Sequence, residues 1–226
     1  RGQLWNNRLF ASSFEGEGYM WATNYRTGFH ENTLYKILVP ETMMEDKDNM
    51  WGPAHEIGHI NQFAINWPGC SESSNNLFSN YVIFKFGKFC SRGTALSELN
   101  NYRVVQDQPF TLISGATHQG ENTELHMRMN WQLFVYFHRV LGDEQFWPRL
   151  FKLLRQTPPV ESNPGWSQLN FAEQACAAAN LDLTDFFEMW GFFVPVDNVP
   201  YEQYGNWTLN VTPAMIAETK ARIAAK

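Results

Sequence analysis

The pentapeptide His55-Glu56-Ile57-Gly58-His59 constrains this chain more than any other feature. If this segment is an α-helix, two histidines four residues apart lie on one face of it, one turn from each other. Both imidazoles can then reach one metal ion, which for zinc needs a nitrogen distance of about 2.0–2.1 Å. Glu56 can take a proton from a metal-bound water as that water attacks a carbonyl. We therefore expect two ligands and a general base in a single helical turn.

A third protein ligand decides which class of zinc site this helix can form. The metzincin motif needs Gly at position 62 and His at position 65, whereas this chain has Gln62 and Ile65, so that class is excluded. Glu72 follows the Pro68-Gly69 turn, which allows the chain to reverse, and Glu98 is the second candidate. Two imidazoles and one carboxylate leave zinc an open position for water, as catalysis requires. The predicted metal ligands are His55, His59 and Glu72.

Asn75 and Asn76 come three and four residues after Glu72 and share its side of the expected helix. Either amide could hydrogen-bond to the Glu72 carboxylate and orient it toward the metal. Plain exposure on the helix surface is the competing interpretation.

The rest of the chain indicates a mainly α fold (α+β), a zincin-like domain with a small β portion on its N-terminal side. We expect one catalytic domain over residues 1–226, with strands and loops at 1–48 and helices at 49–226. Strand-like runs lie at 19–25 and 34–39, a polar loop at 45–49, and irregular chain at 191–204. The expected helices are 51–66, 72–87, 94–105, 123–141, 143–156, 167–179, 182–190 and 213–225.

Two proline positions refine the expected helix starts. Pro53 should lie in the first turn of the motif helix, where its missing N–H costs nothing. Thr212 should cap the last helix, with Pro213 at its first position.

The blocks around the motif resemble the enhancin-like zinc metallopeptidases over roughly residues 15–155. The specific part runs from Trp51-Gly52-Pro53-Ala54 through the motif to Gln62, Trp67-Pro68-Gly69, Glu72 and Asn75-Asn76-Leu77-Phe78-Ser79. Further blocks are Met127-Arg128-Met129-Asn130-Trp131-Gln132-Leu133 and Phe146-Trp147-Pro148-Arg149-Leu150.

This resemblance implies a gluzincin-type Zn²⁺ site with His55, His59 and Glu72 as ligands and Glu56 as base. It also implies secreted or cell-surface bacterial enzymes that cleave mucins and other O-glycosylated proteins. Little of the region that usually precedes the active-site helix is present, so we expect the chain to be the C-terminal part of a longer protein.

Cleavage of a peptide bond also needs a donor for the oxyanion that develops on the carbonyl. His126 is preferred, because it comes early in the expected long helix beside a block that resembles the family, although a lone helical histidine is more often structural. The full set of candidates is His118, His126, Tyr102 and Tyr136.

Trp67 and Trp131 flank the motif blocks and could stack on sugar rings, with core packing as the default for most tryptophans. Arg128 and Asn66 could hydrogen-bond to a glycan. We take Trp67 and Arg128 as the candidate substrate-binding residues.

The composition of the chain argues against some classes of binding partner. A net charge of −6 argues against nucleic acid or an anionic membrane surface, and no apolar run is long enough to span a membrane. Three cysteines at wide spacing form no disulfide framework and are expected to be buried thiols. A monomer is the default expectation.

The sequence thus predicts a zinc endopeptidase that hydrolyses O-glycosylated, mucin-type proteins through a zinc-bound water activated by Glu56. The alternatives are an inactive glycoprotein-binding module of the same fold and a zinc aminopeptidase. Intact Glu56 argues against the binding module, and no motif for fixing a free amino terminus is evident.

Overall fold

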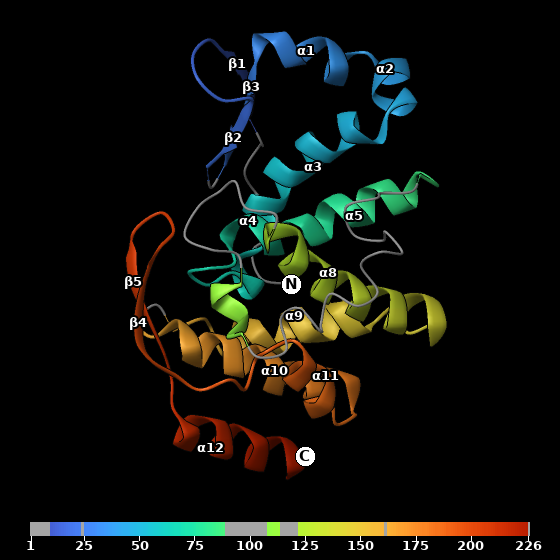
Figure 1. Cartoon of the computed structure of the whole chain (residues 1–226). Coiled ribbons are helices and arrows are strands. Elements are labelled where there is room, and N and C mark those ends of the chain that lie inside the picture. The colour runs from blue at the N-terminus through green and yellow to red at the C-terminus, as the bar shows by residue number, and fades with distance from the viewer. Residues whose placement is uncertain (1–9, 24, 89–107, 114–121, 161, 226) are drawn as a thin grey trace. The chain divides into compact units, whose positions relative to one another are not determined.

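The computed structural model consists mainly of helices, with a small sheet near the N-terminus and a late hairpin (Figure 1). The expected mainly α class with a β portion on the N-terminal side is therefore confirmed. The structure describes residues 10–23, 25–88, 108–113, 122–160 and 162–225. The chain divides into two compact units, Arg1–Phe63 with Asn75–Gly93 and Ala64–Ser74 with Thr94–Lys226.

The first unit opens with a three-stranded sheet in the order β1-β3-β2. Its strands are β1 (Phe10–Phe14), β2 (Met20–Ala22) and β3 (Arg26–His30). β3 lies in the middle, parallel to β1 and antiparallel to β2. The predicted strand at 19–25 is thus confirmed only in part, over the residues of β2.

Two short helices follow the sheet, α1 (Glu31–Leu38) and α2 (Pro40–Glu45). The predicted strand at 34–39 is wrong, because α1 takes up most of this run. The His30 side chain accepts a hydrogen bond from the backbone N–H of Asn32 and caps the helix. The large side chains of Tyr35 and Leu38 remain exposed, so no strand partner or core holds this run extended.

The motif helix α3 spans Lys47–Asn61 and begins earlier than the sequence suggests. The predicted loop at 45–49 is wrong over most of its length, and Pro53 lies inside the helix rather than in its first turn. The Asn49 side chain donates to the carbonyl of Thr42 at 2.9 Å and so ties the helix start to α2. A proline inside a helix removes the backbone hydrogen bond to the carbonyl four residues earlier, here that of Asn49.

α5 (Asn76–Lys85) packs against α3. The contact is close at Gly58, where an added Cβ would lie 2.6 Å from the backbone oxygen of Asn75. Buried side chains on both helices, among them Met50, Trp51, Leu77 and Ile83, form the core of this unit. This packing places the motif helix directly against α5.

The second unit is built around α10 (Pro164–Ala179), which packs against α9 (Phe146–Gln156) and α12 (Pro213–Ala224) (Figure 1). Its other helices are η1 (Phe63–Ile65, shared at the boundary), α4 (Ser71–Ser74), η3 (Phe110–Leu112), α8 (Asn122–Phe134), the π-helix η4 (Val135–Val140) that continues α8, and α11 (Thr184–Met189). Its core is aromatic, with Phe110, Phe137, Phe146, Phe171, Phe187, Trp190 and Phe192 fully buried.

Most helices predicted for this unit are confirmed within a few residues, and Thr212 caps α12 with Pro213 at its start, as expected. The predicted helix at 72–87 is instead two helices, α4 and α5, separated at Asn75. The predicted helix at 94–105 lies outside the described residues.

A β-hairpin replaces part of the irregular chain expected at 191–204. β4 (Val196–Glu202) pairs with β5 (Asn206–Val211) in antiparallel register. Pro200 lies within β4, and a strand of a two-stranded hairpin has one edge without a neighbour, where a missing N–H is tolerated.

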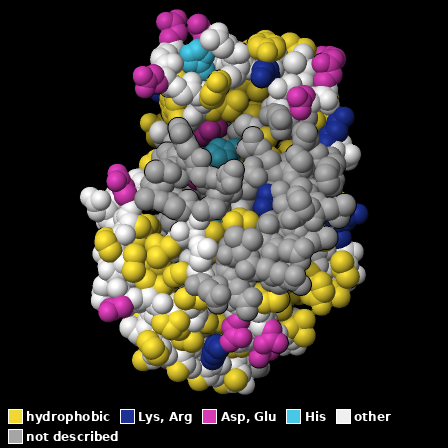
Figure 2. All heavy atoms as spheres, in the orientation of Figure 1, with side chains coloured by type: hydrophobic (Ala, Val, Ile, Leu, Met, Phe, Trp, Pro, Cys, Tyr) yellow, Lys and Arg dark blue, Asp and Glu magenta, His cyan; other side chains and the backbone are white. Residues whose placement is uncertain are grey.

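Charged side chains of both signs are interspersed on the face of the molecule seen in Figure 2. Cys70 and Cys176 are buried thiols, as expected, whereas Cys90 lies outside the described residues. Among the helices that the structure describes, none combines the length and the hydropathy that crossing a membrane demands.

Candidate metal centre

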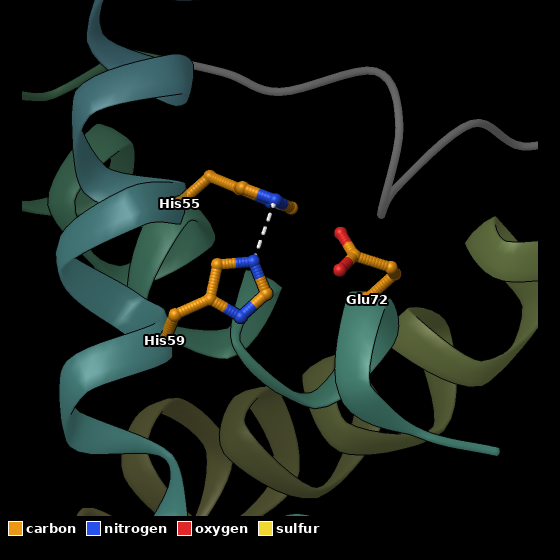
Figure 3. Close-up of side chains that lie close together, drawn as sticks. All are labelled: His55, His59 and Glu72. Carbon is orange, nitrogen blue, oxygen red and sulfur yellow. Dashed lines mark hydrogen bonds between the residues drawn. The ribbon is translucent and has the colours of Figure 1, made fainter. Parts of the chain in front are cut away.

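The two motif histidines project from α3 with their imidazole rings 4.7 Å apart, edge to face (Figure 3). Their Nε2 atoms are separated by 3.2 Å. Two ligands of a tetrahedral zinc ion, each at about 2.0–2.1 Å, are about 3.3 Å apart. The spacing of the pair therefore fits two corners of a zinc coordination shell.

Glu72 completes the predicted set. The ligand atoms of His55, His59 and Glu72 all lie within 4.8 Å of one another, and each side chain is half-buried. Figure 3 shows the Glu72 carboxylate directed toward the two imidazoles. Two imidazoles with one carboxylate are a donor set typical of catalytic zinc, so these residues fit the ion that the sequence implies.

Neighbouring amides hold the imidazoles in place. Nδ1 of His55 lies 2.7 Å from Oδ1 of Asn76, and Nδ1 of His59 lies 3.0 Å from the Gln62 amide nitrogen. The amide nitrogen of Asn75 lies 3.0 Å from both Nδ1 of His55 and Nε2 of His59. A carbonyl oxygen can only accept, so Oδ1 of Asn76 receives the Nδ1–H of His55, which leaves Nε2 of His55 unprotonated for a metal.

Asn75 and Asn76 were predicted to orient the Glu72 carboxylate, and the structure gives both amides contacts with His55 as well. Asn75 precedes α5, the helix that packs against α3, and so lies beside the motif histidines.

Glu56 lies on α3 beside His55 and is 5% exposed. A carboxylate next to a metal ligand can reach a metal-bound water and take its proton. Its place in the same helical turn as both histidines is the one that the motif predicts.

His126 is fully buried in α8, which corrects the expectation that it donates to an oxyanion. Its Nε2 donates to the backbone carbonyl of Phe110, and its Nδ1 lies 3.4 Å from the Ser73 hydroxyl and 3.9 Å from the Cys70 sulfur. Burial lowers the pKa of His126 to about 4 and raises that of the Cys70 thiol. A neutral imidazole with both nitrogens engaged in the interior cannot reach a scissile carbonyl.

Trp67 also differs from its predicted role. It is 4% exposed, its indole N–H donates to the Thr111 hydroxyl at 3.0 Å, and its ring packs near Phe110 and Phe171. An interior ring cannot stack on a sugar, so Trp67 is a core residue.

The other residues that the sequence suggests for the metal, the oxyanion or the substrate lie in the interior, on the surface or outside the described residues. Trp131 and Arg128 on α8 are buried, Arg128 with 8% exposure. Tyr136 is exposed on η4. Glu98, Tyr102 and His118 lie outside the described residues.

Tyr204 was missed at the sequence level. Its hydroxyl donates to Oε1 of Glu72 at 2.5 Å from the tip of the β4–β5 hairpin. No local pattern could have found it, because 132 residues separate the two side chains. Gln62 appears in the sequence only as part of a motif block, and its contact with His59 shows that it supports a candidate ligand.

A helix with two histidines one turn apart, a glutamate beside the first, and a second glutamate near both rings defines a metallopeptidase of the zincin class. The model of the Peptidase M60 family, enhancin and enhancin-like, matches residues 6–191. The chain belongs to this family.

Solved structures agree with this assignment. A metallopeptidase in complex with Tn antigen is 52% identical, with a TM-score of 0.88 over 97% of this chain and 41% of the other. A metallopeptidase from Bacteroides thetaiotaomicron is 50% identical, with a TM-score of 0.83 over 92% of this chain and 35% of the other. This chain therefore spans about two fifths or less of the length of these two structures.

A more distant structure, a conserved protein of unknown function from Bacillus anthracis, is 24% identical with a TM-score of 0.62 over 94% of this chain and 38% of the other. At that identity it supports the fold alone. No curated protein sequence matches this chain.

Proposed function

We propose that this chain carries the catalytic centre of a zinc endopeptidase that cleaves O-glycosylated, mucin-type proteins at the bacterial surface or outside the cell. The observation that carries the proposal is the convergence of His55, His59 and Glu72, with Glu56 in the same turn of α3. Family membership supports peptidase chemistry at these residues.

Each residue has a defined task in this proposal. His55, His59 and Glu72 would hold the ion, which when bound supplies Lewis acidity toward water and carbonyl groups. Glu56 accepts a proton from the attacking water as the new C–O bond forms at the scissile carbonyl. It then returns the proton to the departing nitrogen as the C–N bond breaks, which leaves one carboxylate and one amine.

The support for a glycosylated substrate comes from a similar protein. The metallopeptidase that is 52% identical to this chain was solved in complex with Tn antigen, a glycan. The present chain spans 41% of that structure, so parts of the similar protein that this chain does not cover can contribute to its substrate choice. Glycan dependence of this chain therefore requires a direct measurement.

The experiment uses a peptide with one O-linked N-acetylgalactosamine and the same peptide without the sugar. Product formation is followed by mass spectrometry for the wild type, Glu56→Gln and, as a matched control, Glu41→Gln, which changes an exposed glutamate on α2. We expect the wild type and the control to cleave only the glycopeptide. Glu56→Gln should lose at least about 100-fold in rate, a general-base contribution, yet bind one zinc ion per chain.

Other outcomes separate the alternatives. Equal cleavage by Glu56→Gln would remove the general-base assignment. Glycopeptide binding without cleavage by zinc-loaded wild type would favour the binding module. Cleavage of single residues from the amino terminus would favour the aminopeptidase.

A further inference from the structure

The tip of the β4–β5 hairpin contacts the segment that carries Glu72. The hairpin follows residue 191, where the match to the family model ends, and Figure 1 shows it as a long arm in the C-terminal part of the chain. The three-residue loop at 203–205 joins Glu202 to Asn206, the last pair of the ladder. This hairpin is therefore a feature that the family match does not include.

Three side chains of the tip bind consecutive parts of residues 68–72. The Tyr201 hydroxyl donates to the carbonyl of Pro68 at 2.8 Å. Oε1 of Gln203 accepts from the backbone N–H groups of Gly69 at 2.6 Å and of Ser71 at 3.2 Å. The first N–H groups of a helix have no partner within the helix, so Gln203 satisfies donors at the start of α4.

The third contact reaches the predicted metal ligand itself. The Tyr204 hydroxyl donates to Oε1 of Glu72 at 2.5 Å. A carboxylate has two oxygens and about four lone-pair positions, so accepting this hydrogen bond is compatible with metal ligation. Hydrogen bonds to ligating carboxylates orient them, and their loss typically weakens metal binding about 10–100-fold.

The backbone of the tip places the phenol at a conformational cost. Tyr204 has φ of +51°, in the left-handed region that non-glycine residues seldom adopt. Gln203 N–H donates to the Gly205 carbonyl at 3.0 Å, and the Trp207 indole donates to the Gln203 carbonyl at 2.9 Å, so the turn is held closed. Tyr204 is 66% exposed, so burial in the core does not explain this backbone conformation.

We propose that Tyr204 is a positioning residue for the metal site, which holds the Glu72 carboxylate in its ligating orientation while Tyr201 and Gln203 fix the segment beneath it. This inference rests on the proposed function, because it requires Glu72 to bind zinc. It assigns the hairpin a share in metal affinity.

The test measures zinc affinity by competition with a chromophoric chelator. Tyr204→Phe removes only the hydroxyl, and Tyr35→Phe, at a tyrosine on α1 that is 60% exposed, is the matched control. We expect Tyr204→Phe to raise the zinc Kd about 10-fold or more, and Tyr35→Phe to leave it within about 2-fold of the wild type. The thermal midpoints of the metal-free proteins should agree, which excludes a general loss of stability.

A double-mutant cycle shows whether Tyr204 acts through Glu72. In a Glu72→Gln background, Tyr204→Phe should raise the zinc Kd less than about 2-fold further, because the carboxylate that it positions is absent. A full 10-fold loss in both backgrounds would refute the positioning role, as would an unchanged Kd for Tyr204→Phe alone.

The same titrations separate this inference from the proposed function. Wild type should bind one zinc ion per chain, and His55→Ala should abolish that binding. If this holds and Tyr204→Phe has no effect, only the positioning role fails. If wild type binds no zinc, or His55→Ala binds it equally well, both proposals fail.

Discussion

Protonation of His126 should oppose folding, because the imidazole is buried as a neutral group. Its pKa is about 4 in the folded chain against 6.5 for an ordinary histidine, chiefly because burial disfavours the charged form. Between these values the unfolded chain binds more protons than the folded chain. Stability is therefore fully present above pH 6.5 and is lost as the pH falls toward 4.

The size of the effect follows from the two pKa values. Because the pKa of His126 shifts from 6.5 to about 4, the free energy of unfolding should be about 3 kcal/mol lower at pH 4 than at pH 7. At pH 5 it should be about 2 kcal/mol lower than at pH 7. That is a large share of the roughly 5–15 kcal/mol by which domains are stable. Because His126 is fully buried, solvent screening does not greatly reduce this loss of stability.

The assay is urea unfolding at pH 7 and pH 5 with a chelator present, because proton competition at His55 and His59 would otherwise change zinc binding over the same range. His126→Gln keeps an N–H donor for the Phe110 carbonyl but has no titrating ring. Between pH 7 and pH 5, the free energy of unfolding of His126→Gln should fall by about 2 kcal/mol less than that of the wild type. His138→Gln, which removes a histidine stacked on Phe134, should retain the wild-type loss. Equal pH dependence in wild type and His126→Gln would refute the argument.

Two packing predictions complete the set. Gly58→Ala should destabilise the chain by about 1–3 kcal/mol, because its Cβ would meet the Asn75 backbone oxygen at 2.6 Å, whereas at Gly52→Ala the flexible end of the Met20 side chain can move aside. Similar urea midpoints for both variants would contradict this. Gln168→Leu should cost about 3 kcal/mol or more, because the buried amide accepts from the Thr111 N–H and hydroxyl and donates to the Phe192 carbonyl. Gln174→Leu, which loses one hydrogen bond to Asn170, is its control, and equal losses would show that the amide network contributes little.

The candidate metal ligands could be proposed from the sequence because most of their geometry is local. His55, Glu56 and His59 lie in one turn of one helix, so their spacing alone brings them together. Glu72 follows a Pro-Gly turn, and the ligand atoms do lie within 4.8 Å of one another. The partners of these groups were less predictable, because the contacts of Asn75 and Asn76 with His55 depend on how α5 packs against α3.

The interior of the second unit shows the opposite case. His126 and Trp67 have residue types that suit a substrate site, and their positions in the sequence lie beside motif blocks. Burial decides their roles, and burial depends on which elements pack above them, here η3 with Phe110 and Thr111. A sequence without an alignment holds no measure of that packing.

Features that arise from hydrogen bonds and side-chain spacing within a few residues follow from the sequence: the His-Glu-x-x-His turn, the Thr212-Pro213 helix start and the mainly helical class. The contact of Tyr204 with Glu72 and the burial of His126 next to Ser73 arise from long-range packing. Such contacts join residues 53 to 132 positions apart. They depend on the packing of the whole unit, which local spacing does not encode.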